Sequence, residues 1–369
     1  MKKLIWGFVI VAVVAVFGGR AWYLYQHRDT NDDVVKIGVL GVLSGQYAFI
    51  GEELTKGVTL ASEELKKSSD LSLVLNVEDG KGKTKDAVSG YNKLLFDKVD
   101  TVIVMGDNQV PVAAPLAVEH KIPTIGTITG IQDFLNVNKE KTIVFNNWPS
   151  TYIGCLYVGK YAKENLNLNN VGVIYMSSPL ASEALRGFRE GFGKDFVVTE
   201  TFKEADIDTR SQVLKVMAQN PDAVFVVGFG PGFLSTFNRL KEMKYPGVIL
   251  SDNKAGATDV IAAVKDLSNI YYYDTANVDN ELSKHFQQAY LKRFGAEPSE
   301  FARTGYDSVM RIAKAIELKG KDNIRDGLAE IKEMDTTSGH LKFLPNGGVE
   351  FPLVIKQMQA DKTEKTIKE

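Results

Sequence analysis

Cysteine and histidine are scarce in this chain of 369 residues. Cys155 is the single cysteine, which excludes an internal disulfide and any cysteine-based zinc site. It lies in the apolar stretch YIGCLYVGKYA, where a small buried hydrophobic side chain is expected rather than a reactive thiol. The four histidines are scattered without the spacing of metal ligands: His27, His120, His285 and His340. The sequence therefore predicts no bound metal.

An excess of basic charge is also missing. The chain has 44 lysines and arginines against 46 aspartates and glutamates, so its formal net charge is -2. It has no stripe of basic residues interleaved with aromatics, which argues against nucleic acid as a partner. A hydrophobic content of 44% and a charged content of 24% are those of a globular protein. The length exceeds that of one ordinary core and predicts two domains.

The motifs of common enzymes are absent as well. The sequence contains neither a G-x-S-x-G elbow nor an H-E-x-x-H motif. Residues 82–84 (GKT) resemble the end of a P-loop, but Val77 stands where that loop needs a glycine. Residues 228–233 resemble a dinucleotide fingerprint, yet Phe233 replaces the third glycine and Pro231 removes a backbone donor.

Pairs of carboxylates also have simpler explanations than catalysis. Glu63 with Glu64, and Asp206 with Asp208, are interpreted as solvated helix faces and caps. We therefore predict a protein that is not an enzyme and needs no cofactor. A nucleotide-dependent enzyme remains the least favoured alternative, and cofactor binding at residues 228–232 would reveal it.

A long apolar run occupies the start of the chain. Two lysines precede an apolar centre from Leu4 to Phe17, which fits a secretory signal cleaved near Ala21. The alternative that we favour is an uncleaved anchor of residues 4–25, which would span about 30 Å of hydrocarbon. Residues 26–33 then form a polar tether. Because positive charge stays inside, both alternatives place the globular part in the periplasm or on the outer face of the cytoplasmic membrane.

A β-loop-α unit opens the globular part. The apolar run from Val35 to Leu40 is too short for a helix and rich in β-branched residues, which is typical of a buried strand. Beyond a glycine-rich loop, apolar residues recur at helical spacing: Leu54, Val58, Ala61 and Leu65. Ligands of open α/β sheets bind beyond the carboxyl ends of the strands. The loop is therefore a candidate ligand contact, with a tight connection as the alternative.

This unit resembles the start of the periplasmic substrate-binding proteins of the leucine/isoleucine/valine-binding type. The resemblance rests on the glycines, the leucine, the serine and the aromatic residue of the pattern: Gly41, Leu43, Ser44, Gly45, Tyr47, Gly51 and Gly57. Later stretches match the family in order: Pro221–Gly228, Thr304–Glu317 and Ser338–Met358. The resemblance implies two lobes joined by three crossings, a ligand in the cleft between them, and closure by hinge bending.

The predicted fold is therefore α/β, with two doubly wound parallel-sheet lobes joined by a three-crossing hinge. Strands and helices alternate at the rhythm of a parallel sheet. We place the bounds as follows: lobe 1 at residues 34–145 and 275–335, and lobe 2 at residues 146–274 and 336–360. Residues 341–344 and 349–357 are expected to pair as strands around the turn signal PNGG. The charged tail, residues 361–369, is expected to fray.

The resemblance also implies a set of ligand-binding residues. In family members that bind amino acids, groups after the third and fourth strands hold the carboxylate, and an acid of the second lobe holds the ammonium. The matching loops give nine residues: Ser44, Tyr47, Asn108, Gln109, Thr127, Thr129, Ser178, Phe229 and Asp252. Asn253 is an alternative to Asp252 as the residue near the usual acid. The structural alternatives are a turn cap for Thr129, a core position for Phe229 and a helix cap for Asp252.

Two of these loops depart from the family pattern. Asn108 and Gln109 stand where serine is usual, and Ser178 lies in a loop where tyrosine followed by glycine is usual. Because an unpaired buried polar group of a ligand costs about 1–3 kcal/mol, we do not expect an unchanged branched-chain amino-acid site. Asn108 and Gln109 can both donate and accept hydrogen bonds, so they suit an amide, a sugar or a carboxylate.

The predicted function is capture of a small polar organic solute, an amino acid or an amino-acid-like compound, for an ABC-type permease. Binding would shift the population from open to closed. The alternative is a membrane-tethered sensor that acts through a partner membrane protein. The expected partners are the solute, the membrane subunits of a permease, and the membrane itself through the N-terminal segment.

Overall fold

The computed structural model describes residues 34–69, 71–276 and 278–368. The predicted signal or anchor in residues 1–25 and the tether in residues 26–33 lie outside the described residues. Within the described ranges, no helix combines the length and the apolar character needed to cross a membrane.

The first lobe is built on a five-stranded parallel sheet in the order β2-β1-β3-β4-β5. Its strands are β1 (Val34–Gly41), β2 (Ser72–Asp79), β3 (Thr101–Met105), β4 (Thr124–Thr127) and β5 (Val144–Asn146). Side chains of a strand point to alternate faces, so Ile37 and Val39 enter one core and Leu40 enters the other. The sheet is therefore covered on both faces, as the apolar run at β1 predicted.

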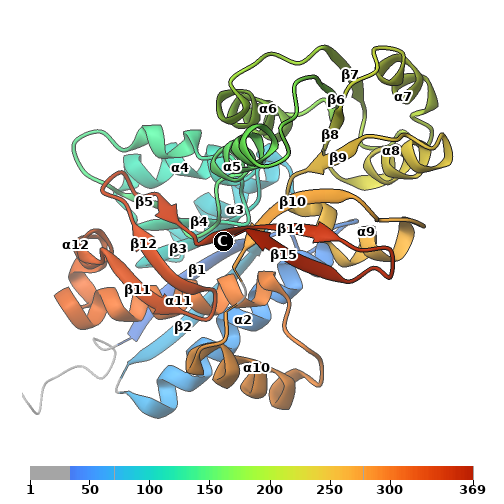
Figure 1. Ribbon diagram of the computed structural model, residues 1–369. Helices are drawn as coiled ribbons and strands as arrows, with labels where there is room; N and C mark the ends of the chain where they lie inside the picture. The colour runs from blue at the N-terminus through green and yellow to red at the C-terminus, as the bar shows by residue number, and fades with distance from the viewer. Residues whose placement is uncertain (1–33, 70, 277, 369) are drawn as a thin grey trace, which may run out of the picture.

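Helices from two distant parts of the chain cover this sheet (Figure 1). One face carries α2 (Ala48–Ser68), α10 (Glu281–Phe294), α11 (Glu300–Lys319) and α12 (Ile324–Glu330). The other face carries α3 (Thr84–Phe96), α4 (Val110–His120) and the 3-10 turn η1 (Asp133–Val137). Residues 281–330 thus help to complete the core that residues 34–146 begin.

The second lobe holds a seven-stranded sheet in the order β15-β14-β10-β9-β8-β6-β7. Its parallel strands are β6 (Val171–Met176), β7 (Val198–Phe202), β8 (Ala223–Val227), β9 (Val248–Ser251) and β10 (Ile270–Thr275). The antiparallel edge consists of β14 (Leu353–Met358) and β15 (Glu364–Lys368). Five helices cover its faces: α5 (Thr151–Glu164), α6 (Pro179–Phe192), α7 (Arg210–Met217), α8 (Gly230–Glu242) and α9 (Thr258–Ala263).

The chain passes between the two sheets three times. It leaves the first sheet after β5, returns from β10 to α10, and leaves again between β13 (Val349–Glu350) and β14. The prediction of an α/β fold with two parallel-sheet lobes is confirmed. Residues of all three crossings line one cavity, and the Ala276 N–H donates to the Pro352 carbonyl at 2.9 Å. Neighbouring crossings of this kind permit hinge bending.

The bounds near residues 336–360 differ from the prediction. A small antiparallel sheet of β11 (Glu333–Thr336), β12 (Gly339–Phe343) and β13 packs on the first lobe, because Leu341, Phe343 and Val349 enter its core. The expected second strand at residues 349–357 is divided into β13 and β14 at Pro352, which has no N–H to donate to a ladder.

The described part of the charged tail, residues 361–368, is ordered, contrary to the prediction. Residues 364–368 form β15, which pairs with β14. The Glu364 carboxylate accepts a hydrogen bond from the Tyr272 hydroxyl and lies 2.9 Å from the Lys356 Nζ atom. A charged sequence is thus ordered by partners that lie on other strands of the sheet.

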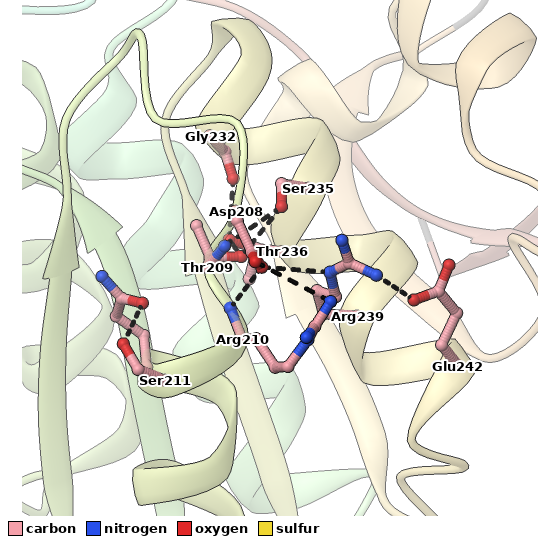
Figure 2. A network of polar contacts seen from close by, with 10 residues as sticks. Asp208, Thr209, Arg210, Ser211, Gly232, Ser235, Thr236, Arg239 and Glu242 are labelled. Carbon is pink, nitrogen blue, oxygen red and sulfur yellow. Dashed lines mark hydrogen bonds and ion pairs between the residues drawn. The ribbon is translucent and has the colours of Figure 1, made fainter.

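The acidic residues after β7 have structural roles, in keeping with the sequence interpretation. Asp206 accepts a hydrogen bond of 2.7 Å from the Lys203 N–H. Asp208 accepts hydrogen bonds from the Arg210 N–H and, at 3.2 Å, from the Arg239 Nε atom of α8 (Figure 2). These contacts fix the start of α7 against α8.

Candidate functional site

Tyr47 joins the two lobes directly. It follows β1 in the first lobe, and its hydroxyl donates a hydrogen bond to Glu204, which follows β7 in the second lobe. The Tyr47 ring meets the Phe229 ring edge-on, with centroids 6.1 Å apart. Burial raises the pKa of Tyr47 and the bond to Glu204 raises it further, so the hydroxyl keeps its proton and remains a donor. The structure thus brings together two of the nine predicted residues.

We expect Tyr47→Phe to shift the solute-free protein toward a more open arrangement. Loss of one hydrogen bond between the lobes costs about 1 kcal/mol, which changes the ratio of the two states roughly fivefold. Small-angle scattering would detect this as a larger radius of gyration. The matched control is Tyr152→Phe, because Tyr152 bonds Glu190 within the second lobe. Equal expansion of both variants would contradict a role for Tyr47 in joining the lobes.

Two predicted residues are buried in structural positions. The side chain of Gln109 is fully buried, and its Nε2 atom donates to the Met105 carbonyl at 2.7 Å. It lies against Gly80, where an added Cβ would come within 1.7 Å of the Gln109 amide oxygen. Thr127 is also fully buried, and its hydroxyl lies 2.7 Å from that of Thr304 on α11. Both side chains therefore hold elements of the first lobe together.

Three other predicted residues stabilise the loops that carry them. The Ser44 hydroxyl bonds Asp79, which also accepts a hydrogen bond from the Leu43 N–H. The side-chain amide of Asn108 donates to the Gly82 carbonyl at 3.2 Å. Ser178 caps α6 by accepting a hydrogen bond of 3.2 Å from the Ala181 N–H. Ser44 and Asn108 remain exposed.

Charged residues that sequence reasoning missed surround Thr129 and Asp252. The Thr129 hydroxyl donates to Asp107 at 2.8 Å, and the Gly130 N–H donates to the same carboxylate oxygen at 3.1 Å. In the second lobe, the Lys254 ammonium lies 3.4 Å from Asp252. Asp252 also caps the 3-10 turn η2 (Asn253–Gly256). Thr129 thus makes its hydrogen bond, and Asp252 its ion pair, with other residues of the protein.

Lys254 links these two groups electrostatically. Burial disfavours its ammonium, but the carboxylates of Asp252 and Asp107 outweigh that effect and raise the pKa of Lys254. Burial raises the pKa of Asp252 and of Asp107, although Lys254 acts in the opposite direction on both. The predicted acid of the second lobe, Asp252, is therefore paired with a lysine of its own lobe.

A cavity of about 340 Å³ lies at the three crossings. Its walls come from the segment after β5, the end of β10, the start of α11 and the small sheet, and include Trp148, Asp274, Glu300, Arg303, Asp307 and Phe351. Both lobes contribute, because α11 belongs to the first lobe and Asn253 to the second. Of the nine predicted site residues, all of them within the described ranges, none lines this cavity. The alternative to Asp252, Asn253, does line it.

Glu300 provides an acidic group in the cavity wall. This residue is exposed to solvent at the edge of the cavity. The surrounding protein and the nearby Asp274 raise the pKa of Glu300, against the opposing charges of Lys254 and Lys356. Across the described part of the chain, its carboxylate makes no hydrogen bond or ion pair. Asp274, by contrast, is paired with Lys356 at 2.6 Å.

Arg303 provides the basic group in the same wall. Its Nη1 atom donates to the Ser283 hydroxyl at 2.8 Å and to the Thr337 carbonyl at 3.4 Å. No carboxylate among the described residues lies within ion-pair distance of it. Burial lowers the pKa of Arg303, although Asp307 and Glu297 act in the opposite direction. The Nε and Nη2 atoms make no hydrogen bond to the described residues, and the guanidinium carbon lies 5.7 Å from the centroid of the Phe286 ring.

Two lobes joined by three crossings around such a cavity define a hinged binding protein. The chain belongs to the periplasmic binding protein family, whose model matches residues 34–362. Among curated proteins, it is 22% identical to Leu/Ile/Val-binding protein homolog 1 of Brucella suis over 372 residues, which covers 95% of this chain and 95% of that protein. The family consists of non-enzymatic solute-binding proteins, so the predictions of family and of a non-enzymatic function are confirmed.

Solved structures share the fold along most of the chain. The branched-chain amino acid transporter substrate binding protein LivJ of Streptococcus pneumoniae, in complex with isoleucine, has a TM-score of 0.78 and 24% identity, covering 91% of this chain and 100% of that chain. A solute binding protein of an ABC transporter from R. palustris, in complex with benzoate, has a TM-score of 0.76 and 18% identity. The match covers 91% of this chain and 96% of that chain. At these identities the likeness concerns the fold.

Proposed function

We propose that this chain is the solute-binding component of an ABC-type transporter and captures a small amino-acid-like or organic-acid solute between its lobes. The observation that carries the proposal is the cavity at the crossings, because a solute held there would contact both lobes and favour the closed arrangement. Its volume of about 340 Å³ suits a small solute. The names of the relatives, which refer to leucine, isoleucine, valine and benzoate, support this class.

Thermal unfolding of the purified full chain would test this function. The compounds are leucine, isoleucine, 5-aminopentanoate, benzoate, glucose and NAD. A solute at about 100 times its dissociation constant stabilises the folded state by about 2.7 kcal/mol, which raises the melting temperature by several degrees. We expect a shift with an amino acid or an organic acid. A shift with NAD alone would favour the nucleotide-dependent alternative, and the absence of any shift would count against the proposed solute class.

We also propose that the chain works outside the cytoplasm, attached to the membrane through residues 4–25. The family is extracytoplasmic, and the apolar run with its two preceding lysines supports the anchor. Purification of the intact chain from membranes would test this, because a cleaved signal would leave a protein that starts near residue 22. Copurification of permease subunits would support transport, whereas a receptor kinase would favour the sensor.

A further inference from the structure

Two exposed apolar side chains lie near the amino ends of the strands in the first lobe. Val74, on the edge strand β2, is 44% exposed, and Phe96, the last residue of α3, is 84% exposed. Asn76 shares the sheet face of Val74, and its side-chain amide donates to the Asp97 carboxylate at 3.4 Å. This contact places the residue after Phe96 beside the face that carries Val74.

Lysines surround these two apolar residues. Lys36 on β1 is the register partner of Val74, and its Nζ atom reaches the Asp97 carbonyl at 3.4 Å. Because the strands are parallel, each helix that connects them ends at the edge of the sheet where the strands begin.

Basic residues predominate among the exposed charges of this edge. We compared the described residues from two positions before the end of α2, α3, α4 and η1 to the start of the next strand. The exposed lysines there are Lys66, Lys67, Lys98, Lys121, Lys139 and Lys141, and the exposed acids are Asp100, Glu119 and Glu140. The Asp100 carboxylate is engaged within the protein, since it accepts the Lys36 N–H at 2.7 Å.

The chain enters the first lobe at this same edge. β1 starts at Val34, which is the register partner of Ser72, the first residue of β2. Residues 26–33 separate Val34 from the proposed anchor, and a segment of that length spans at most about 29 Å. Attachment through residues 4–25 therefore holds this edge near the lipid surface. We call it the tether edge and define it by six residues: Lys36, Lys66, Lys67, Val74, Phe96 and Lys98.

We propose that the tether edge docks on anionic phospholipid of the membrane to which the chain is attached, with Phe96 and Val74 at the lipid interface and the lysines at the headgroups. The proposal rests on the membrane attachment proposed above. Each lysine near an anionic lipid surface favours the docked state about fivefold. The apolar side chains contribute further, because they leave water for the interface.

Docking fixes the direction in which the solute cavity faces. Tyr47 follows the carboxyl end of β1 and bonds Glu204 of the second lobe, so the second lobe lies at the opposite edge of the first sheet. The strand β1, from Val34 to Gly41, spans about 26 Å between the two edges. The cavity at the crossings therefore faces away from the lipid in the docked chain.

Spin-label depth measurements on the full chain in vesicles would test the docking. The label is attached through Phe96→Cys, because Cys155 is fully buried and the nitroxide side chain is bulky and apolar like phenylalanine. In vesicles that contain phosphatidylglycerol, we expect this label to collide more with lipid-soluble oxygen than with a water-soluble nickel chelate. The matched control is Ile207→Cys, at an 82% exposed apolar position of the second lobe, where we expect the reverse.

The combined variant Lys66→Gln and Lys67→Gln tests the contribution of charge. Both lysines are exposed in the last turn of α2. We expect the ratio of docked to undocked chain to fall about tenfold or more, and to fall likewise when phosphatidylcholine replaces phosphatidylglycerol. The matched control is Lys160→Gln with Lys163→Gln, at exposed positions on α5 of the second lobe. An equal fall in the two pairs would overturn the assignment to the tether edge.

Flotation of the same vesicles separates the docking from the attachment on which it rests. A chain that floats with the vesicles, but whose label at residue 96 is as accessible to the nickel chelate as the label at residue 207, would overturn the docking and leave the anchor standing. A chain that does not float would overturn both.

Discussion

Replacing Gly57 with alanine will lower the free energy of unfolding by about 3 kcal/mol, although alanine favours a helix by about 1 kcal/mol over glycine. The reason lies in the contact between α2 and α11. A Cβ atom at Gly57 would lie 1.9 Å from the carbonyl oxygen of Ala302 and 3.0 Å from the Tyr306 nitrogen. Both atoms belong to the backbone of α11 and cannot move aside as a side chain would.

The glycine on α11 at this contact, Gly305, also lies close to the backbone of α2. A Cβ atom at Gly305 would lie 2.3 Å from the Leu54 carbonyl oxygen on α2. An alanine at residue 57 would therefore push α11 away from the sheet as a whole. Because the first turn of α11 carries Glu300 and Arg303, the cavity at the crossings would widen and solute affinity would fall along with stability.

Urea unfolding followed by circular dichroism would measure the effect as a lower midpoint at an unchanged slope. The matched control is Ser68→Ala, at an exposed position in the last turn of the same helix. That variant should unfold at the midpoint of the natural protein. If Gly57→Ala were as stable as Ser68→Ala, the two helices would have to lie farther apart than the structure places them.

The fold could be predicted because its signals are local. The strand at β1 follows from a short β-branched run, and α2 follows from apolar residues at helical spacing. Gly57 was recognised as part of a family pattern, but the sequence alone does not reveal that the carbonyl of Ala302 lies against it. That contact joins residues 245 positions apart, and no local pattern reports on it.

Residues 336–350 could not be assigned to the correct lobe from their sequence. Leu341, Phe343 and Val349 alternate as strand residues do, and such a pattern fits either lobe equally well. The lobe to which these strands belong is decided by the core in which their side chains are buried. That core is the core of the first lobe. The order of the tail likewise depends on Tyr272 and Lys356, whose contacts with Glu364 lie on neighbouring strands.

The sequence predicts a candidate site made of loops. The structure shows in addition that the charged residues Asp107 and Lys254 lie beside predicted residues of these loops. Lys254 follows the predicted Asp252 by two residues, but nothing in the sequence indicates that it acts on Asp107 of the other lobe. Glu204 and Arg303 carried no sequence signal, since acidic and basic residues are common on helix ends and loops. Whether the predicted residues contact solute stays a prediction that substitution of Thr129 or Phe229 would address.

The second large expected effect is a loss of stability on substitution of Asp307. This residue lies on α11 and binds the turn between β11 and β12, which forms another part of the cavity wall. Asp307 is only 2% exposed, and its carboxylate accepts four hydrogen bonds from the turn between β11 and β12. The donors are the N–H groups and hydroxyls of two adjacent residues, at 2.9 and 2.8 Å for Thr337 and at 3.2 and 2.6 Å for Ser338. Burial raises the pKa of Asp307, although these hydrogen bonds act in the opposite direction.

We expect Asp307→Ala to destabilise the protein by about 3–5 kcal/mol, because it leaves buried donors without an acceptor. Asp307→Asn keeps one accepting oxygen and should lose less. Urea unfolding would measure both, and hydrogen exchange at the amides of Thr337 and Ser338 would show whether the turn itself opens. The matched control is Asp361→Ala, since Asp361 accepts the same kind of bonds from Thr363 at an exposed site.

The control variant Asp361→Ala should leave unchanged both the free energy of unfolding and the hydrogen exchange at Thr337 and Ser338. At that exposed position water replaces the lost acceptor. In Asp307→Ala, by contrast, the turn that lines the cavity would lose the partner that fixes it, and solute affinity should fall even at temperatures where the protein stays folded. A variant with natural exchange rates at Thr337 and Ser338 would contradict this account. The turn would then be held by the small sheet alone, through the pairing of β11 with β12.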